Sequence, residues 1–305
     1  MAEVLAGGDG ELRRFILERH PMRGFWIRLD GAWREMRRHQ RYPPVVEAVL
    51  GEAVTASLLL AATLKFHGTL TLQLAGDGLI NLLVAQCTHE FVIRAVARFD
   101  DGFDGVIAFR QLVGDGRLTV TIEAEERSAR YQGIVALAGA TLAECLENYF
   151  ATSEQLPTRI ALAADHVSGG GVLLQKLPAA AGAQGEALAA VSQHVWEDLQ
   201  SRVATLDASL LRLGAAEEVL QRVCGEHDCR LFQGSPVRFA CRCSEGRVAG
   251  LLRSLGPEEM RSILAEQGAV TVTCEFCGRP YRFDAIDVER LFAGGANPEA
   301  PHSLN

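Results

Sequence analysis

The sequence lacks an uninterrupted apolar run long enough to predict a membrane-spanning helix. Its longest apolar stretch, residues 53–64, is interrupted by Thr and Ser, whereas a membrane-spanning helix needs about 20 apolar residues. The first fifteen residues lack the basic start and apolar run of a signal peptide. These absences predict a cytoplasmic protein with no membrane partner.

Excess positive charge is also missing. The 305 residues include 30 Lys plus Arg against 38 Asp plus Glu, so the net charge is −8 at pH 7. Nucleic-acid binding needs Lys and Arg concentrated against phosphate, and residues 242–290 hold seven Arg against eight acidic residues. We expect no nucleic-acid partner.

Catalytic motifs are absent as well. The sequence has no Walker A loop, no G-x-S-x-G and no H-E-x-x-H, and its histidines have no paired nucleophile motif. Gly76-Asp77-Gly78 lies between two strand patterns rather than before a helix, which favours a hairpin turn over a phosphate loop. No catalytic residue is predicted, and we expect a protein that is not an enzyme.

What is present indicates an α+β core over residues 1–178. Hydrophobic residues make up 48% of the chain and charged residues 22%, which is ordinary for a globular protein with room for two domains. An apolar Ala- and Leu-rich segment after Pro43-Pro44 predicts a buried helix that packs against a sheet. Alternating strands follow between residues 68 and 137, then a helix with a capping box at Thr141–Glu144, which stops before Pro157. Residues 158–165 and 171–177 read as closing strands around a turn at Gly169–Gly171.

Residues 179–237 predict a helical linker. Apolar side chains recur three or four residues apart and must be covered: Leu188, Val191, Val195, Leu199, Val203, Leu206, Leu210 and Leu213. Gly182, Gly185 and Gly214 each weaken a helix by about 1 kcal/mol relative to alanine. Two interpretations stay open at this point: a metastable linker that relies on docking, and a helical hairpin packed permanently on the core.

Residues 238–292 predict a small C-terminal domain. Gly256-Pro257 separates two short helices, VTVTCEFCGRPYRF reads as a strand, a knuckle and a returning strand, and Asp284 caps a last helix. The tail, residues 293–305, is polar and rich in Pro and Gly, which predicts disorder.

Four cysteines form the most informative motif of the chain, a C-x-C…C-x-x-C set made of Cys241, Cys243, Cys274 and Cys277. A domain of some fifty residues buries little apolar surface, so a metal that holds it together is physically reasonable. Four thiolates and no open position are typical of structural zinc, which outweighs the alternative of four unconnected buried cysteines. Because metal-bound thiolates are in the nucleophilic form, an oxidant that reaches them ejects the metal.

Four further cysteines lie outside this set. Cys224 and Cys229 enclose His227; a second metal site there is conceivable, but surface or packing roles are favoured because no other ligand cluster accompanies them. Cys87 and Cys145 fall in a strand pattern and a helix pattern, which indicates buried, inert thiols.

The sequence resembles the 33-kilodalton heat shock protein family of redox-regulated holdase chaperones. The resemblance rests on FACRCSEGRVAGLLRSLGPEEM and EQGAVTVTCEFCGRPYRFDAIDVERLF in the C-terminal domain. It also rests on LGEAVTASLLLAATLKFHGTLTLQLAGDG and on YQGIVALAGATLAECLENYFATSEQLPTRIAL in the core. The N-terminus and linker match loosely, and Cys224 and Cys229 are not part of the family pattern, so they stand as possible extra redox thiols.

The resemblance implies an ATP-independent chaperone that is inactive while it is reduced and holds one Zn²⁺ per chain. It implies that oxidation forms the disulfides Cys241–Cys243 and Cys274–Cys277, that zinc leaves, and that the zinc domain and linker unfold. The exposed surface then binds unfolding client proteins, commonly as a homodimer, and prevents their aggregation.

Two other classes compete with this interpretation. A zinc-ribbon interaction module or nucleic-acid adaptor would use the metal only for structure, and the charge distribution argues against nucleic acid. A thiol–disulfide oxidoreductase would place its C-x-x-C at a helix N-terminus, whereas here a strand returns directly after the motif.

Overall fold

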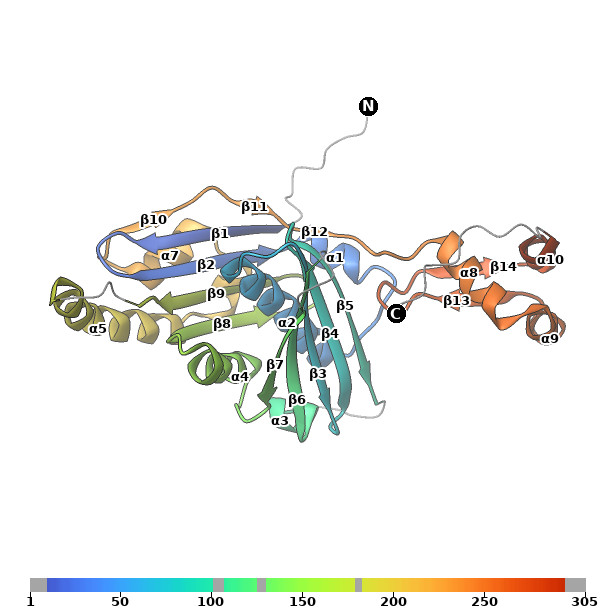
Figure 1. The fold of residues 1–305 in the computed structure, drawn as a ribbon, viewed down its shortest axis with the longest axis horizontal. Coiled ribbons are helices and arrows are strands. Elements are labelled where there is room, and N and C mark those ends of the chain that lie inside the picture. Colours follow the sequence, from blue (N-terminus) through green and yellow to red (C-terminus); the bar gives the residue numbers. More distant parts are fainter. Residues whose placement is uncertain (1–9, 101–106, 125–129, 179–182, 294–305) are drawn as a thin grey trace, which may run out of the picture. The chain divides into compact units, whose positions relative to one another are not determined.

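Contacts divide the chain into two units, residues 1–240 and 241–305, in a computed structural model that describes residues 10–100, 107–124, 130–178 and 183–293. The first unit contains two six-stranded sheets (Figure 1). The first sheet has the order β10-β1-β2-β9-β8, with β11 also paired to β1. Its strands are β1 (Gly10–Leu17), β2 (Met22–Leu29), β8 (Thr158–Ala164), β9 (Gly169–Lys176), β10 (Cys229–Leu231) and β11 (Ser235–Pro236).

The second sheet has the order β12-β5-β4-β3-β6-β7. All its pairs are antiparallel except β12 with β5, which run parallel. Its strands are β3 (Gly68–Gly76), β4 (Ile80–Thr88), β5 (Val92–Phe99), β6 (Gly116–Ala124), β7 (Arg130–Ala136) and β12 (Arg238–Phe239). The hairpin expected at Gly76–Gly78 is present between β3 and β4.

Helix α2 (Pro44–Thr63) packs against strands of both sheets, as Figure 1 shows. The proline at its first turn and its burial confirm the prediction for this segment. The length estimate made from the apolar run was wrong, because this helix is long and apolar enough to cross a membrane by composition alone. Its most apolar window is 78% buried in the unit, so its hydrophobic surface is used for packing.

Three shorter helices pack around the two sheets. They are α1 (Gly31–Met36), α3 (Phe109–Val113) and α4 (Leu142–Tyr149), and α4 continues into a π-helical turn, Phe150–Glu154. The Thr141 hydroxyl accepts a hydrogen bond from the Glu144 backbone N–H at 3.2 Å, which confirms the predicted cap. The Glu144 carboxylate in turn accepts from the N–H of Ala140 at 2.7 Å, one residue earlier than an ordinary capping box.

The two faces of the first sheet belong to different apolar clusters. Side chains alternate along a strand, so Ile27 and Leu173 face the cluster around α2, while Trp26 and Val172 face the opposite one. That opposite face is covered by three helices of the linker segment, residues 179–237: α5 (Ala183–Ala204), α6 (Ala208–Leu213) and α7 (Ala216–Cys224). The apolar stripe of the linker is therefore packed on the sheet.

The linker differs from the continuous stripe that the sequence suggested. Its helices break at Thr205–Asp207 and at Gly214. Leu199 and Val203 are buried, but Val191 is 61% exposed and Leu213 is 58% exposed, and the side chain of Leu188 lies outside the described residues. Leu213 follows the break at Thr205–Asp207. Val191 precedes both breaks, and it is exposed because the packed face of α5 contains Trp196, Leu199 and Val203 instead.

The turn predicted at Gly169–Gly171 was also misplaced. These glycines form the start of β9, and the turn before them is residues 165–168. A Cβ on Gly170 would lie 1.9 Å from the carbonyl oxygen of Leu211, so the glycine lets α6 approach the strand backbone. The polar N-terminal region was not predicted as β-structure either, yet β1 and β2 supply two strands of the first sheet.

The second unit contains α8 (Glu245–Leu255), α9 (Pro257–Gln267), β13 (Val270–Thr273), β14 (Pro280–Phe283) and α10 (Ala285–Ala293). The helix break at Gly256-Pro257 and the strand, knuckle and returning strand agree with the sequence. Asp284 Oδ1 accepts from the N–H of Asp287 at 2.9 Å, which is the expected cap. Residues 294–305, most of the predicted disordered tail, lie outside the described residues.

Candidate metal centre

The second unit brings four sulfur atoms together. The Sγ atoms of Cys241, Cys243, Cys274 and Cys277 all lie within 4.8 Å of one another. Cys241 and Cys274 are 3.6 Å apart and Cys243 and Cys277 are 3.4 Å apart, and each of these contacts joins one motif to the other. Among the described residues this is the one cluster of His, Cys, Asp or Glu that is arranged to hold a metal ion.

Local backbone structure orients the four thiols. In the knuckle between β13 and β14, Gly278 N–H donates to the carbonyl of Cys274 at 2.8 Å, and Cys274 N–H donates to that of Arg279 at 3.0 Å. Gly278 has a φ of 67°, a conformation that favours glycine. On the other side, Ser244 caps α8 through a hydrogen bond from Arg247 N–H at 3.3 Å, directly after Cys243. Both pairs of cysteines are therefore held at the ends of regular elements.

The separations fit tetrahedral thiolate coordination. A Zn–S bond of about 2.3 Å in a tetrahedron places neighbouring sulfurs about 3.8 Å apart. The observed 3.4 and 3.6 Å and the 4.8 Å limit for all pairs bracket that value. Four soft ligands and no fifth protein group suit a closed structural site.

Hydrogen bonds within the cluster favour deprotonation at one cysteine. Burial raises the pKa of Cys243, but hydrogen bonds from the Tyr281 hydroxyl and from the other three thiols outweigh it, and the pKa falls to about 7. The pKa of Cys241 is raised, chiefly by burial. A thiolate held inside such a cluster is stabilised further by a cation at its centre.

Tyr281 is a residue of the site that the sequence reasoning missed. Its hydroxyl is buried and makes no hydrogen bond of ordinary geometry, but it lies close enough to Cys243 to lower the pKa of that thiol. It lies in β14, four residues after Cys277, and partly buried Val272 faces it across the strand pair. The spacing within C-G-R-P-Y was a signal that could have identified it as a neighbour of the metal ligands.

The remaining cysteines lie in the first unit. Cys87 in β4 and Cys145 in α4 are buried, and burial raises the pKa of each thiol, in agreement with inert packing roles. Cys224 is buried at the end of α7, and Cys229 is partly buried at the start of β10. His227 faces Asp198, with 3.3 Å between Nε2 and Oδ2, so the structure does not bring it into a metal cluster with the two thiols.

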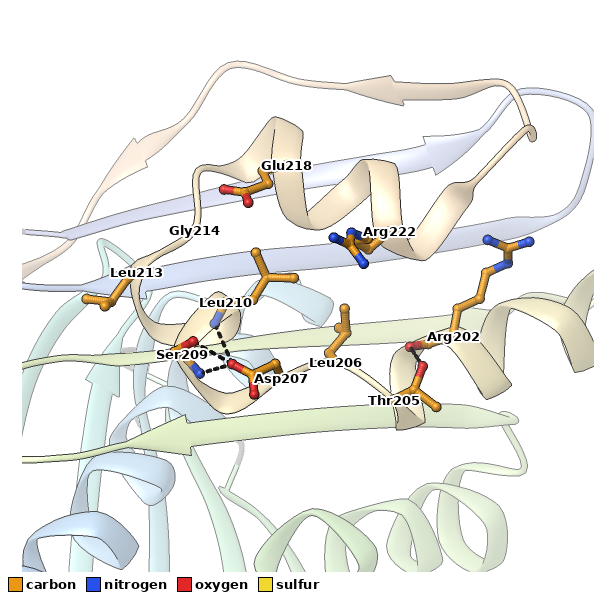
Figure 2. A pocket seen from close by; sticks show the side chains of 10 residues that line it. All are labelled: Arg202, Thr205, Leu206, Asp207, Ser209, Leu210, Leu213, Gly214, Glu218 and Arg222. Atoms are coloured by element: carbon orange, nitrogen blue, oxygen red, sulfur yellow. Dashed lines mark hydrogen bonds between the residues drawn. The ribbon is translucent and has the colours of Figure 1, made fainter.

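The linker segment contains a cavity of about 580 Å³ next to its docked helices (Figure 2). Arg202, Leu206, Leu213 and Arg222 are among the side chains that line it. Asp207 caps α6 at its edge by accepting from Ser209 N–H at 2.8 Å and from Leu210 N–H at 3.3 Å. The linker helices thus leave space among themselves although their apolar faces contact the sheet.

Fold and site together define a two-unit α+β protein whose smaller unit has four cysteines arranged to hold a metal ion. The chain belongs to the Hsp33 protein family, whose family model matches residues 10–284. It is 42% identical over 282 residues to the 33 kDa chaperonin of Nitrosococcus oceani, covering 92% of this chain and 93% of that protein. It is 40% identical over 286 residues to the 33 kDa chaperonin of Chromobacterium violaceum, with coverages of 92% and 93%.

A solved structure has the same fold. The crystal structure of the 33 kDa chaperonin (heat shock protein 33 homolog) of Thermotoga maritima superposes with a TM-score of 0.76 at 22% identity. The match covers 93% of this chain and 98% of that one. The resemblance seen in the sequence and the predicted α+β fold class are both confirmed.

Proposed function

We propose that this chaperone-family chain is a redox-regulated, ATP-independent holdase, inactive while its four cysteines hold one Zn²⁺. The single observation that carries the proposal is the cluster of Cys241, Cys243, Cys274 and Cys277, which provides a closed ligand set and four oxidisable thiols at once. Oxidation to Cys241–Cys243 and Cys274–Cys277 would transfer two electrons per pair to the oxidant, which takes its protons from water because metal-bound thiolates carry none. The same step removes all four ligands from the metal.

Without the metal, the second unit would be stabilised only by a small apolar cluster. Its buried apolar cluster contains six residues: Ala249, Leu252, Met260, Val270, Phe283 and Val288. Structural zinc contributes about 10–16 kcal/mol to small domains at neutral pH, which exceeds the net stability of most domains of this size. Oxidation is therefore expected to unfold residues 238–292.

Release of the linker is the second part of the proposal. The chain enters the second unit two residues after Phe239 of the short strand β12, which is held by only two register positions against β5. The linker, residues 179–237, covers one apolar face of the first sheet. The cavity among its helices and the exposed side chain of Leu213 support the proposal that its docking is only weakly stable. Once undocked, Trp26, Val172 and their neighbours would present a sheet face that binds unfolded chains.

These steps assign the parts of the chain. Residues 1–178 act as the core chaperone domain, 179–237 as the metastable linker, 238–292 as the switch domain and 293–305 as a tail. The partners are unfolding client proteins, the active form is a homodimer, and the protein works in the cytoplasm without nucleic acid or membrane. No catalytic turnover is involved.

One experiment tests the proposal and the disulfide pairing together. The zinc-loaded protein is treated with peroxide under mild heating, while zinc release and suppression of a client's aggregation are followed in parallel. Trypsin separates Cys241 and Cys243 into peptides 239–242 and 243–247, but leaves Cys274 and Cys277 in peptide 262–282. Pairing within motifs joins the first two peptides and closes the third on itself, whereas pairing between motifs joins the third to the others.

Equal holdase activity in the reduced, zinc-loaded protein would overturn the switch. That result would favour the second candidate, an interaction module or nucleic-acid adaptor with purely structural zinc. The net charge of −8 speaks against the nucleic-acid form of that alternative.

A further inference from the structure

A second pair of thiols lies in the first unit, where the linker meets the sheet. Cys224 ends α7 and Cys229 begins β10, and Cys229 packs against the apolar cluster that contains Cys224. A tight turn makes this possible: Gly225 takes a φ of 57°, and His227 N–H donates to the carbonyl of Cys224 at 3.0 Å. Cys229 is then fixed by pairing with Leu17 of β1.

The two thiols differ in exposure and in hydrogen bonding. Cys224 is 3% exposed within the apolar cluster under the linker, whereas Cys229 is partly exposed. Cys224 donates its S–H to the sulfur of Cys229, which lowers the pKa of Cys229 and raises that of Cys224. The Cys229 sulfur is thus the one suited to react first with an oxidant, and the Cys224 sulfur is the one suited to attack it afterwards.

Positive charge lies close to the pair. The guanidinium of Arg202 lies against Gly225, such that a Cβ on the glycine would meet Nη1 at 2.6 Å. Asp198 holds Arg202 in place through a 2.8 Å contact with its Nε. The pair has a cation beside Cys224 and partial exposure at Cys229, and both are features of reactive cysteines, whereas Cys87 and Cys145 are buried singly.

We propose that Cys224 and Cys229 form a second redox site, which a peroxide oxidises to an intramolecular disulfide independently of the four-cysteine centre. The Cys229 thiolate attacks the peroxide, becomes a sulfenic acid and releases an alcohol or water once the leaving oxygen takes a proton. The Cys224 sulfur then attacks the Cys229 sulfur, an S–S bond forms, and hydroxide leaves with the Cys224 proton as water. Overall, two thiols and one peroxide give one disulfide, one alcohol or water, and one further water.

The disulfide suits the docked linker. Both thiols lie at the ends of one short turn and pack at the same apolar cluster, so a bond between them would join the end of α7 to β10 without separating either from the sheet. Both cysteines lie within the linker, so the bond would close a short loop there and couple undocking of α7 to that of β10, which pairs with β1. Formation of this disulfide does not rest on the proposed holdase function.

The decisive measurement uses one tryptic peptide. Arg222 and Arg230 flank residues 223–230, so VCGEHDCR carries both cysteines and no others. The zinc-loaded protein is treated with peroxide, quenched in acid and alkylated under denaturing conditions before digestion. We expect this peptide to lose two hydrogens and both alkylation sites, and to regain the sites after reduction. Cys87 and Cys145 serve as internal controls that stay alkylatable.

Two outcomes would overturn the proposal: both thiols still alkylatable after the metal ligands are fully oxidised, or either thiol joined to another peptide. The order of attack is tested with single variants and a sulfenic-acid probe. Cys224→Ser should label at Cys229 about tenfold more than Cys229→Ser labels at Cys224. Equal labelling would contradict the assigned roles, and circular dichroism of each variant checks that the fold is retained.

Discussion

The backbone of Gly170 in β9 and the carbonyl of Leu211 in α6 are in direct contact. A Cβ at position 170 would lie 1.9 Å from the carbonyl oxygen, which is a separation no side chain accepts. An ion pair between Arg212 and Asp165 holds the same helix beside the turn that precedes β9. Docking of the linker thus depends on a position without a side chain.

Gly170→Ala is expected to displace α6 and loosen the linker in the reduced protein. Overpacking of this kind typically costs about 1–3 kcal/mol, and here the cost falls on docking rather than on the strand. Limited proteolysis should cut within residues 204–215 faster than in the parent protein, with the metal still bound. Gly250→Ala is the control, because a Cβ there meets nothing within 4 Å. Unchanged cleavage in Gly170→Ala would contradict this account of docking.

Cys243→Ser is expected to lose the metal and unfold the second unit. Serine is a poor ligand for a soft-ligand site, and three thiolates leave the coordination incomplete. Zinc content should fall well below one per chain, and hydrogen exchange should show loss of protection across residues 245–293. Cys229→Ser, which changes a thiol in the first unit, should retain the metal. Full zinc content in Cys243→Ser would remove this residue from the ligand set.

Tyr281→Phe is expected to keep the metal but to release it faster under peroxide. The hydroxyl interacts with Cys243, and a hydrogen bond to a metal-bound thiolate lowers the electron density on sulfur and its reactivity. Removing it should raise the rate of zinc release about two- to tenfold. Tyr131→Phe removes a hydroxyl that contacts Tyr149 in the first unit, and it should leave the rate unchanged. A slower release in Tyr281→Phe would reverse the assigned role.

Glu52→Gln is expected to stabilise the first unit above neutral pH. Burial in α2 raises the pKa of Glu52 from 4.5 to about 7. The folded state therefore keeps a proton that the unfolded state loses, so stability falls as pH rises from about 4.5 to 7 and stays lower above that range. The substitution should recover up to about 3 kcal/mol at pH 8 and almost nothing at pH 4.

Thermal unfolding at the two pH values measures this effect. Glu47→Gln is the matched control in the same helix, because Glu47 is buried in an ion pair with Arg37. Loss of that pair should lower the melting temperature at pH 8. The contradicting result would be a difference in melting temperature between Glu52→Gln and the parent protein that is the same at both pH values. It would show that the pKa of Glu52 is not raised in the folded protein.

Local patterns predicted much of the second unit and of the core helix. The C-x-C and C-x-x-C spacing, the break at Gly256-Pro257 and the cap at Asp284 depend on contacts within a few residues, so each was readable in the sequence. The start of α2 at Pro44 was readable for the same reason. Tyr281 was missed because its role depends on which face of β14 meets the sulfurs.

Other features depended on distant residues. The strands β1 and β2 have many polar residues, and they become strands because sheet pairing and cover on both faces stabilise them. Gly169–Gly171 were read as a turn, whereas close approach of α6 requires them in β9. The linker is divided into three helices by breaks at Thr205–Asp207 and Gly214, and all three contribute to one apolar cluster on the sheet.

The sequence by itself determined that four cysteines would form a ligand set, because ligand chemistry is carried by residue type and short spacing. Tertiary structure alone decided what covers the outer face of the first sheet, since only the folded chain brings the linker against β9. It also placed Cys224 against Cys229, through a glycine turn and the pairing of β10 with β1. Contacts between segments that are distant in the sequence leave no recognisable pattern in either segment. Docking of the linker on the sheet is a contact of this kind.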